Sequence, residues 1–125
     1  MQTIYWILII LVAFIGFIIL LSFFQAKKAS VKLNEEEFKN SMRKGQLVDV
    51  RPKQEFQSGH INGARNINMQ MIMRSFHQLR KDQPIYLYCN TGRKSSKAAI
   101  FLRTKGYYEL YELDKGLKNW NGPLK

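Results

Sequence analysis

Residues 85–104 read IYLYCNTGRKSSKAAIFLRT, and this stretch decides the fold. Its first four residues are apolar or aromatic, which predicts a short buried strand over 85–88. Cys89 follows at the carboxyl end of that strand, and a polar loop over 90–95 comes next. Residues 96–104 then predict a helix that is apolar on most sides. A strand, a tight loop and a helix in succession are typical of an α/β domain.

The same alternation continues in both directions along the chain. Short apolar runs predict further strands, and the stretches between them have helical spacing or capping residues. The expected strands are 47–50, 64–67 and 110–113, and the expected helices are 35–44, 53–57, 69–79 and 117–120. We expect one side of the 69–79 helix to face the core through Met69, Ile72, Met73, Phe76 and Leu79. The pattern predicts an α/β domain around a mainly parallel sheet.

Composition limits what this chain can be. Its 125 residues allow one compact domain. Lys and Arg number 20 against 9 Asp and Glu, for a net charge of +11, and there is a single cysteine. One cysteine excludes an internal disulfide and a zinc site built on cysteine pairs, so we expect no metal and no cofactor. No basic helix or aromatic–basic motif accompanies the charge, so we expect no nucleic-acid partner.

The first part of the chain contains an uninterrupted apolar run, residues 4–24, with no charged side chain. As a helix this run is about 31 Å long, which matches the hydrocarbon thickness of a bilayer. A cleaved signal peptide is the first alternative, but the run lacks a basic region before it and a small-residue cleavage site after it. A buried core helix is the second, but about 100 further residues cannot surround an all-apolar helix. We therefore expect a retained single-pass membrane anchor.

The distribution of charge around this run predicts its orientation. No Lys or Arg precedes it, and three follow it closely: Lys27, Lys28 and Lys32. The positive-inside rule therefore places the domain after the anchor in the cytoplasm. The expected organisation is a short extracytoplasmic N-terminus (1–3), a transmembrane helix (4–24), a polar tether (25–32) and a folded domain (33–125).

The loop after Cys89 is suited to holding an anion. Gly92 lets the chain curl tightly, so that successive backbone N–H groups can face the centre of the loop. The N-terminus of the following helix adds partial positive charge, and Arg93 and Lys94 add two full charges. These features favour the thiolate of Cys89, which is the nucleophilic form of cysteine. A cysteine that follows an apolar strand is otherwise most often a small buried hydrophobe.

Three blocks of the sequence together resemble the rhodanese-like domain family, over about residues 33–120. The second block is the strand, Cys89 and its loop, and the third is Gly116 with Trp120. The first block consists of Val48-Asp49-Val50-Arg51, Glu55-Phe56, Gly59-His60-Ile61, Gly63-Ala64 and Asn66-Ile67. Because the three blocks stand in the order of the family, the resemblance is specific. It implies a single α/β domain with a five-stranded, mainly parallel sheet flanked by helices.

The resemblance also implies an activity, which is sulfur transfer. Cys89 would take sulfane sulfur from a thiosulfate-like donor as a persulfide and pass it to cyanide, a thiol or a protein. The loop residues that would hold donor and persulfide are Asn90, Thr91, Gly92, Arg93, Lys94 and Ser95. Two positions depart from the family: Lys94 stands where many members have Arg, and Lys115 where a Gly is frequent. Lysine offers a point charge and no bidentate fork, so donor preference is left open.

Three residues of the first block are candidates for supporting roles. Asp49 and Arg51 can be an acid–base or ion pair near the site, and we favour a structural pair that holds loops at the strand ends. His60 can be read as a general base, but a thiolate already stabilised by its loop needs none, so we interpret His60 as a loop-fixing residue. Glu55 is expected to support the loop after the first block, and His77 to lie on the surface.

Two alternatives to a sulfurtransferase remain at this point. A cysteine phosphatase or arsenate reductase needs an arginine six residues after the cysteine, and Ser95 occupies that position. A non-catalytic docking module or slow sulfur carrier at the membrane is the second alternative, although Cys89 is present.

Overall fold

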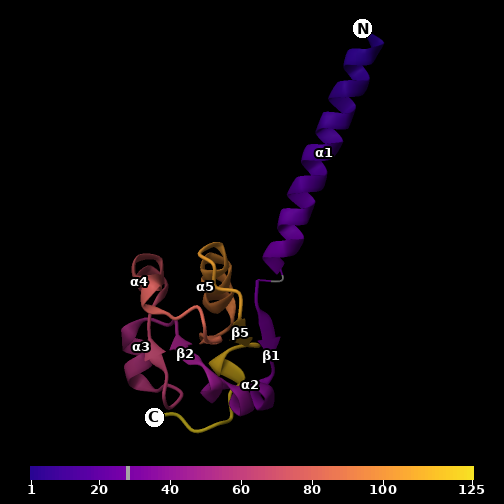
Figure 1. Cartoon of the computed structure of the whole chain (residues 1–125). Helices are drawn as coiled ribbons and strands as arrows, with labels where there is room; N and C mark the ends of the chain where they lie inside the picture. The colour runs from indigo at the N-terminus through magenta and orange to yellow at the C-terminus, as the bar shows by residue number, and fades with distance from the viewer. Residues whose placement is uncertain (28) are drawn as a thin grey trace.

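The computed structural model describes residues 1–27 and 29–125, and it divides into a long N-terminal helix and a compact α/β domain (Figure 1). Helix α1, Gln2–Lys27, extends away from the domain as a single rod. Its segment Gln2–Phe23 is long and apolar enough to cross a membrane, and none of it is buried against the domain. Residue 28, which we expected in the tether and used for the orientation, lies outside the described residues.

A five-stranded sheet forms the centre of the domain, with the strand order β1-β5-β4-β2-β3. Every neighbouring pair is parallel, so the expected mainly parallel five-stranded sheet is confirmed. Strand β4 lies in the middle, where it pairs with β2 on one side and β5 on the other. The strands are β1 Val31–Leu33, β2 Gln46–Asp49, β3 Arg65–Asn66, β4 Ile85–Tyr88 and β5 Leu110–Leu113.

Helices cover both faces of this sheet. The α-helices are α2 Glu35–Ser41, α3 Lys53–Ser58, α4 Met69–Ser75 and α5 Arg93–Thr104, and the 3-10 turns are η1 Met42–Lys44, η2 Phe76–Gln78 and η3 Leu117–Asn119. Asn34 and Asn68 cap α2 and α4 as expected, because each side chain accepts a hydrogen bond from the backbone N–H of the third helical residue, Glu37 and Met71.

Because successive side chains of a strand point to opposite faces of the sheet, the core consists of two layers. Along β4, Ile85 and Leu87 face the layer under α4 and α5, while Tyr86 and Tyr88 face the layer that contains Phe38 of α2. Cys89 continues the first of these rows, so the chain delivers it to the side of the sheet where α5 begins.

Four details differ from the sequence-based expectation. Strand β1 lies partly in the segment that we expected to be a tether, because an edge strand can form from backbone pairing with β5 alone. Strand β3 is shorter than the expected 64–67. Helix α5 begins three residues early, because Gly92 takes a left-handed conformation (φ +95°) and the chain turns directly into the helix. Helix α4 ends at Ser75, where a 3-10 turn follows, and Met73 within α4 is 57% exposed, so Met73 does not lie on the side that faces the core.

Candidate active site

Cys89 lies at the carboxyl end of the central strand and is only 2% exposed. Its Sγ accepts a hydrogen bond from the backbone N–H of Gly92 at 3.0 Å. The same sulfur lies 3.6 Å from the Oγ of Ser95, to which the thiol can donate. A backbone N–H that points at sulfur stabilises negative charge there, so this geometry suits a thiolate or a persulfide.

The loop wraps around this sulfur and runs directly into α5. Because α5 begins at Arg93, its first backbone N–H groups and the positive end of its dipole lie beside the Cys89 loop. Ser95 is fully buried, and its hydroxyl also lies 3.1 Å from the carbonyl of Gly92, closing the loop on itself. Asn90 and Thr91 are exposed at the outer side of the loop.

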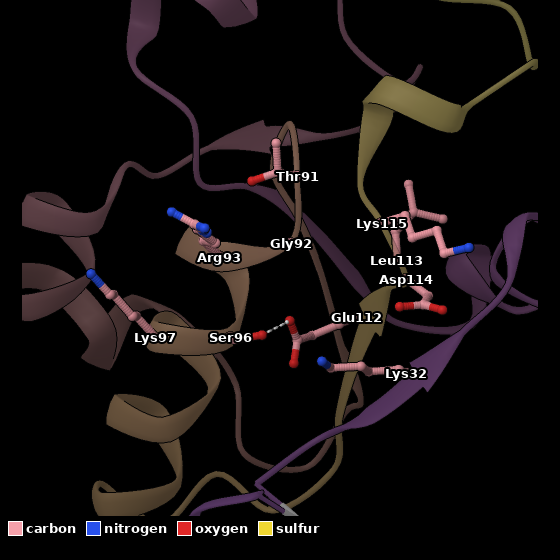
Figure 2. A pocket seen from close by; sticks show the side chains of 10 residues that line it. All are labelled: Lys32, Thr91, Gly92, Arg93, Ser96, Lys97, Glu112, Leu113, Asp114 and Lys115. Atoms are coloured by element: carbon pink, nitrogen blue, oxygen red, sulfur yellow. Dashed lines mark hydrogen bonds between the residues drawn. The ribbon is translucent and has the colours of Figure 1, made fainter.

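The two cations of the loop point to different hollows. Arg93 lines a hollow of about 530 Å³ together with Lys32, Lys97 and Lys115 (Figure 2). Lys94 lines another hollow of about 400 Å³, with Val50, Pro52, Asn68, Met69 and Gln70. Both side chains are exposed, so an anion can meet positive charge on either flank of the loop.

Asp49 and Arg51 form a buried, bidentate ion pair at the end of β2. Arg51 Nη2 and Nε lie 2.7 and 3.0 Å from Asp49 Oδ2, and their side chains are 7% and 0% exposed. Although burial opposes the charged form, the hydrogen bond and the charge of Asp49 raise the pKa of Arg51 above its ordinary value. Arg51 also donates to the carbonyl of Gly59 at 2.5 Å and to Asn90 Oδ1 at 3.4 Å. The pair therefore connects two loops at the carboxyl edge of the sheet.

The remaining candidates surround this edge without contacting the sulfur. His60 stacks on Phe56 with 3.8 Å between ring centroids, and its Nδ1 lies 2.8 Å from the Phe56 carbonyl. Both of these contacts join the loop of His60 to the preceding helix α3. Glu55 accepts a hydrogen bond from the Asn90 side chain at 3.0 Å, and His77 is exposed.

The turn after β5 contacts the cysteine loop through backbone atoms. The N–H groups of Leu117 and Lys118 donate to the carbonyls of Cys89 and Asn90, at 2.9 and 3.0 Å. Gly116, with φ +68°, precedes them, and a Cβ on it would lie 2.5 Å from the Cys89 oxygen. Lys115 adopts a positive φ of 63°, which explains why a glycine suits that position.

One residue near the site was not anticipated. Glu112 of β5 is 2% exposed, and its Oε1 accepts hydrogen bonds from Ser95 and Ser96, at 2.9 Å each. Its Oε2 accepts a third from Ser30. A glutamate inside an otherwise apolar strand was the available signal, since a buried carboxylate needs partners.

The sequence itself matches known proteins over the part of the chain that carries this geometry. Residues 34–123 match the rhodanese-like domain. The chain belongs to the rhodanese-like domain family. Of its relatives, the thiosulfate sulfurtransferase GlpE of Shewanella oneidensis is 36% identical over 76 residues, which cover 61% of this chain and 75% of that protein. The uncharacterized protein YqhL of Bacillus subtilis is 42% identical over 120 residues, which cover 94% of this chain and 95% of that protein.

Solved rhodanese-like structures share this fold. The crystal structure of a rhodanese-like domain protein from Staphylococcus aureus superposes with a TM-score of 0.68 at 27% identity, covering 76% of this chain and 96% of that one. The expected family and fold are thus confirmed, and homologues of this rhodanese-like domain include thiosulfate sulfurtransferases.

Proposed function

We propose that this protein is a membrane-anchored sulfurtransferase that carries sulfane sulfur as a persulfide on Cys89. The observation that carries the proposal is the 3.0 Å hydrogen bond from the Gly92 N–H to Sγ, at the start of α5. That N–H and the helix terminus favour negative charge on sulfur both before and after transfer. The relatives named thiosulfate sulfurtransferase support the choice of reaction.

The reaction runs in two displacements on the same sulfur. The Cys89 thiolate attacks the outer sulfur of thiosulfate, a new S–S bond forms, and sulfite leaves with the electron pair of the bond that breaks. An acceptor nucleophile then attacks the terminal persulfide sulfur, and the thiolate of Cys89 is the leaving group. No net oxidation or reduction of the protein occurs over the cycle.

The surrounding residues would bind and support rather than exchange protons. Exposed Arg93 and Lys94 attract a dianionic donor to either flank of the loop. The other loop residues, from Asn90 to Ser95, hold the persulfide. Asp49 and Arg51 keep the neighbouring loops in place through the Gly59 and Asn90 contacts.

This loop is not suited to binding a phosphate group. The position where a cysteine phosphatase has its arginine is Ser95, which is buried and bonded to the Glu112 carboxylate. No guanidinium fork is therefore available at that position to bind the phosphate oxygens.

Helix α1 would hold the enzyme at a membrane. The length and apolar surface of its segment Gln2–Phe23 match a bilayer span, and the lysines after that segment favour a cytoplasmic domain. Anchoring restricts the enzyme to acceptors at or near the membrane surface.

Intact mass of the full chain in detergent micelles tests the transfer step. After incubation with thiosulfate we expect a gain of about 32 Da, the mass of one sulfur, that cyanide removes. The Cys89→Ser variant is the control and should show no gain. A wild-type protein that gains no mass from thiosulfate or polysulfide would refute the proposal. The remaining functions would then be a non-catalytic docking module or an enzyme that acts on another anionic substrate.

A further inference from the structure

Glu112 is a buried carboxylate for which the reaction above has no use. Among the residues whose side chains the structure describes, 1–23 and 29–125, no Lys or Arg nitrogen lies within 4 Å of its carboxylate, and the side-chain hydrogen bonds it accepts from them come from hydroxyl groups. These hydroxyls come from Ser95 and Ser96 in the first turn of α5 and from Ser30 before β1. Figure 2 shows the carboxylate between Ser96 and the side chain of Lys32, its neighbour in the paired strand.

Ser95 connects this carboxylate to the reactive sulfur. Its single hydroxyl hydrogen can be donated to Glu112 Oε1 at 2.9 Å or to the Gly92 carbonyl at 3.1 Å. A charged acceptor makes the stronger hydrogen bond, so the hydrogen points at Glu112. The lone pairs of the Ser95 oxygen then face Cys89 Sγ, 3.6 Å away, and receive the thiol hydrogen.

We propose that Glu112 is a positioning residue that sets the pH range in which Cys89 becomes a thiolate, and that it acts through the orientation of the Ser95 hydroxyl. This inference rests on the proposed sulfur-transfer function. While Glu112 is ionised, Ser95 presents only lone pairs to sulfur, which stabilises the resting thiol. The Gly92 N–H opposes this by stabilising the thiolate.

Other charged groups face the same carboxylate, and the cations among them act in the opposite direction. The cations are Lys32 on β1, Arg93 and Lys97 on α5, and Lys115 after β5, while Asp114, also after β5, carries the same charge as Glu112. All are exposed, so solvent screens them more strongly than it screens the buried contact with Ser95.

The test is a pH titration of the Cys89 thiolate in the full chain in detergent, without any sulfur donor. Thiolate absorbance in the ultraviolet is measured, and the matching Cys89→Ser protein is subtracted to remove the tyrosine signal. Because Cys89 is the single cysteine, the difference belongs to one group. Glu112→Gln keeps an acceptor oxygen and removes the charge. We expect its midpoint to fall by about one pH unit, equivalent to a roughly tenfold larger ratio of thiolate to thiol below the midpoint.

Two variants distinguish an effect of Glu112 that passes through Ser95 from a direct effect of the Glu112 charge on Cys89. Ser96→Ala removes a hydroxyl from the same Oε1 but does not contact the sulfur, so its midpoint should match the wild type. Ser95→Ala removes the connection, so it should lower the midpoint, and Glu112→Gln should add little to it. An equal effect of Glu112→Gln with and without Ser95 would overturn the proposed route.

An unchanged midpoint in a folded Glu112→Gln protein, checked by circular dichroism, would overturn the proposal altogether. If that variant does not fold, an unchanged midpoint in Ser95→Ala has the same consequence. The titration needs no sulfur donor, so its result is independent of persulfide formation. A shifted midpoint without the 32 Da gain would refute only the sulfur-transfer function.

Discussion

Replacing Gly116 with alanine should displace the loop that follows Cys89, although Gly116 itself lies in the turn after β5. The residue has φ +68° and ψ −165°, a region of backbone conformation that is essentially restricted to glycine. An added Cβ would lie 2.5 Å from the carbonyl oxygens of Cys89 and Asn90 and from the Asn90 carbonyl carbon. All three are backbone atoms, so no side-chain rotation relieves the contact, and the turn and the loop must move apart.

The expected loss of stability has two sources. Holding alanine in this conformation costs about 1–3 kcal/mol. Forcing two packed backbones apart costs about 1–3 kcal/mol more, and it weakens the hydrogen bonds from Leu117 and Lys118 to the loop. We therefore expect the free energy of unfolding to fall by about 2–6 kcal/mol. The loop should also lose its register around Cys89, so sulfur transfer should fall with it.

Gly63→Ala is the matched control. Gly63 also has a positive φ, +90°, but nothing lies within 4 Å of an added Cβ. The control carries backbone strain without the contact, so it should lose about 1–2 kcal/mol and keep its sulfur transfer. Urea denaturation of both full-length variants in detergent, followed by circular dichroism, gives the two stability changes. Transfer from thiosulfate to cyanide is measured well below each midpoint.

The comparison between the two glycines decides the outcome. Equal losses of stability in the two variants would show that the contact with the cysteine loop carries no energy. Full sulfur transfer in a destabilised but folded Gly116→Ala protein would show that the turn does not position Cys89. Either result would refute the reasoning.

Three further predictions concern other parts of the site. Burial, followed by the charge of Asp49, raises the pKa of Tyr88, so the contribution of Tyr88 to stability is intact below about pH 10 and is lost as the pH rises further. Tyr88→Phe should reduce that alkaline loss, but it should cost about 1–3 kcal/mol at neutral pH because the Ile61 N–H loses its acceptor. Denaturation at several pH values measures both effects. Asp49→Asn leaves the Arg51 charge buried without a carboxylate, so urea denaturation should show a loss of about 3–5 kcal/mol; a loss under 1 kcal/mol would contradict this. Lys94→Ala should raise KM for thiosulfate and change stability by less than about 0.5 kcal/mol, and an unchanged KM would remove Lys94 from the site.

Much of the fold was predictable because its signals are local. The apolar residues of β4 and the asparagine caps of α2 and α4 each act within a few residues of chain. The place of Cys89 at the end of the central strand follows from the same local order. Strand β1 escaped prediction because three residues are too few to show a strand pattern, and pairing with β5 holds them in place.

The sequence by itself determined the alternation of strands and helices and the family, and it pointed to Cys89 as the candidate nucleophile. Only the tertiary structure decided what surrounds that cysteine. Glu112 reaches Ser95, and the turn at Gly116 reaches the Cys89 carbonyl, because β5 lies directly beside β4 in the sheet. Strand order depends on packing across the whole domain, so residues brought together by it leave no local signal in the sequence.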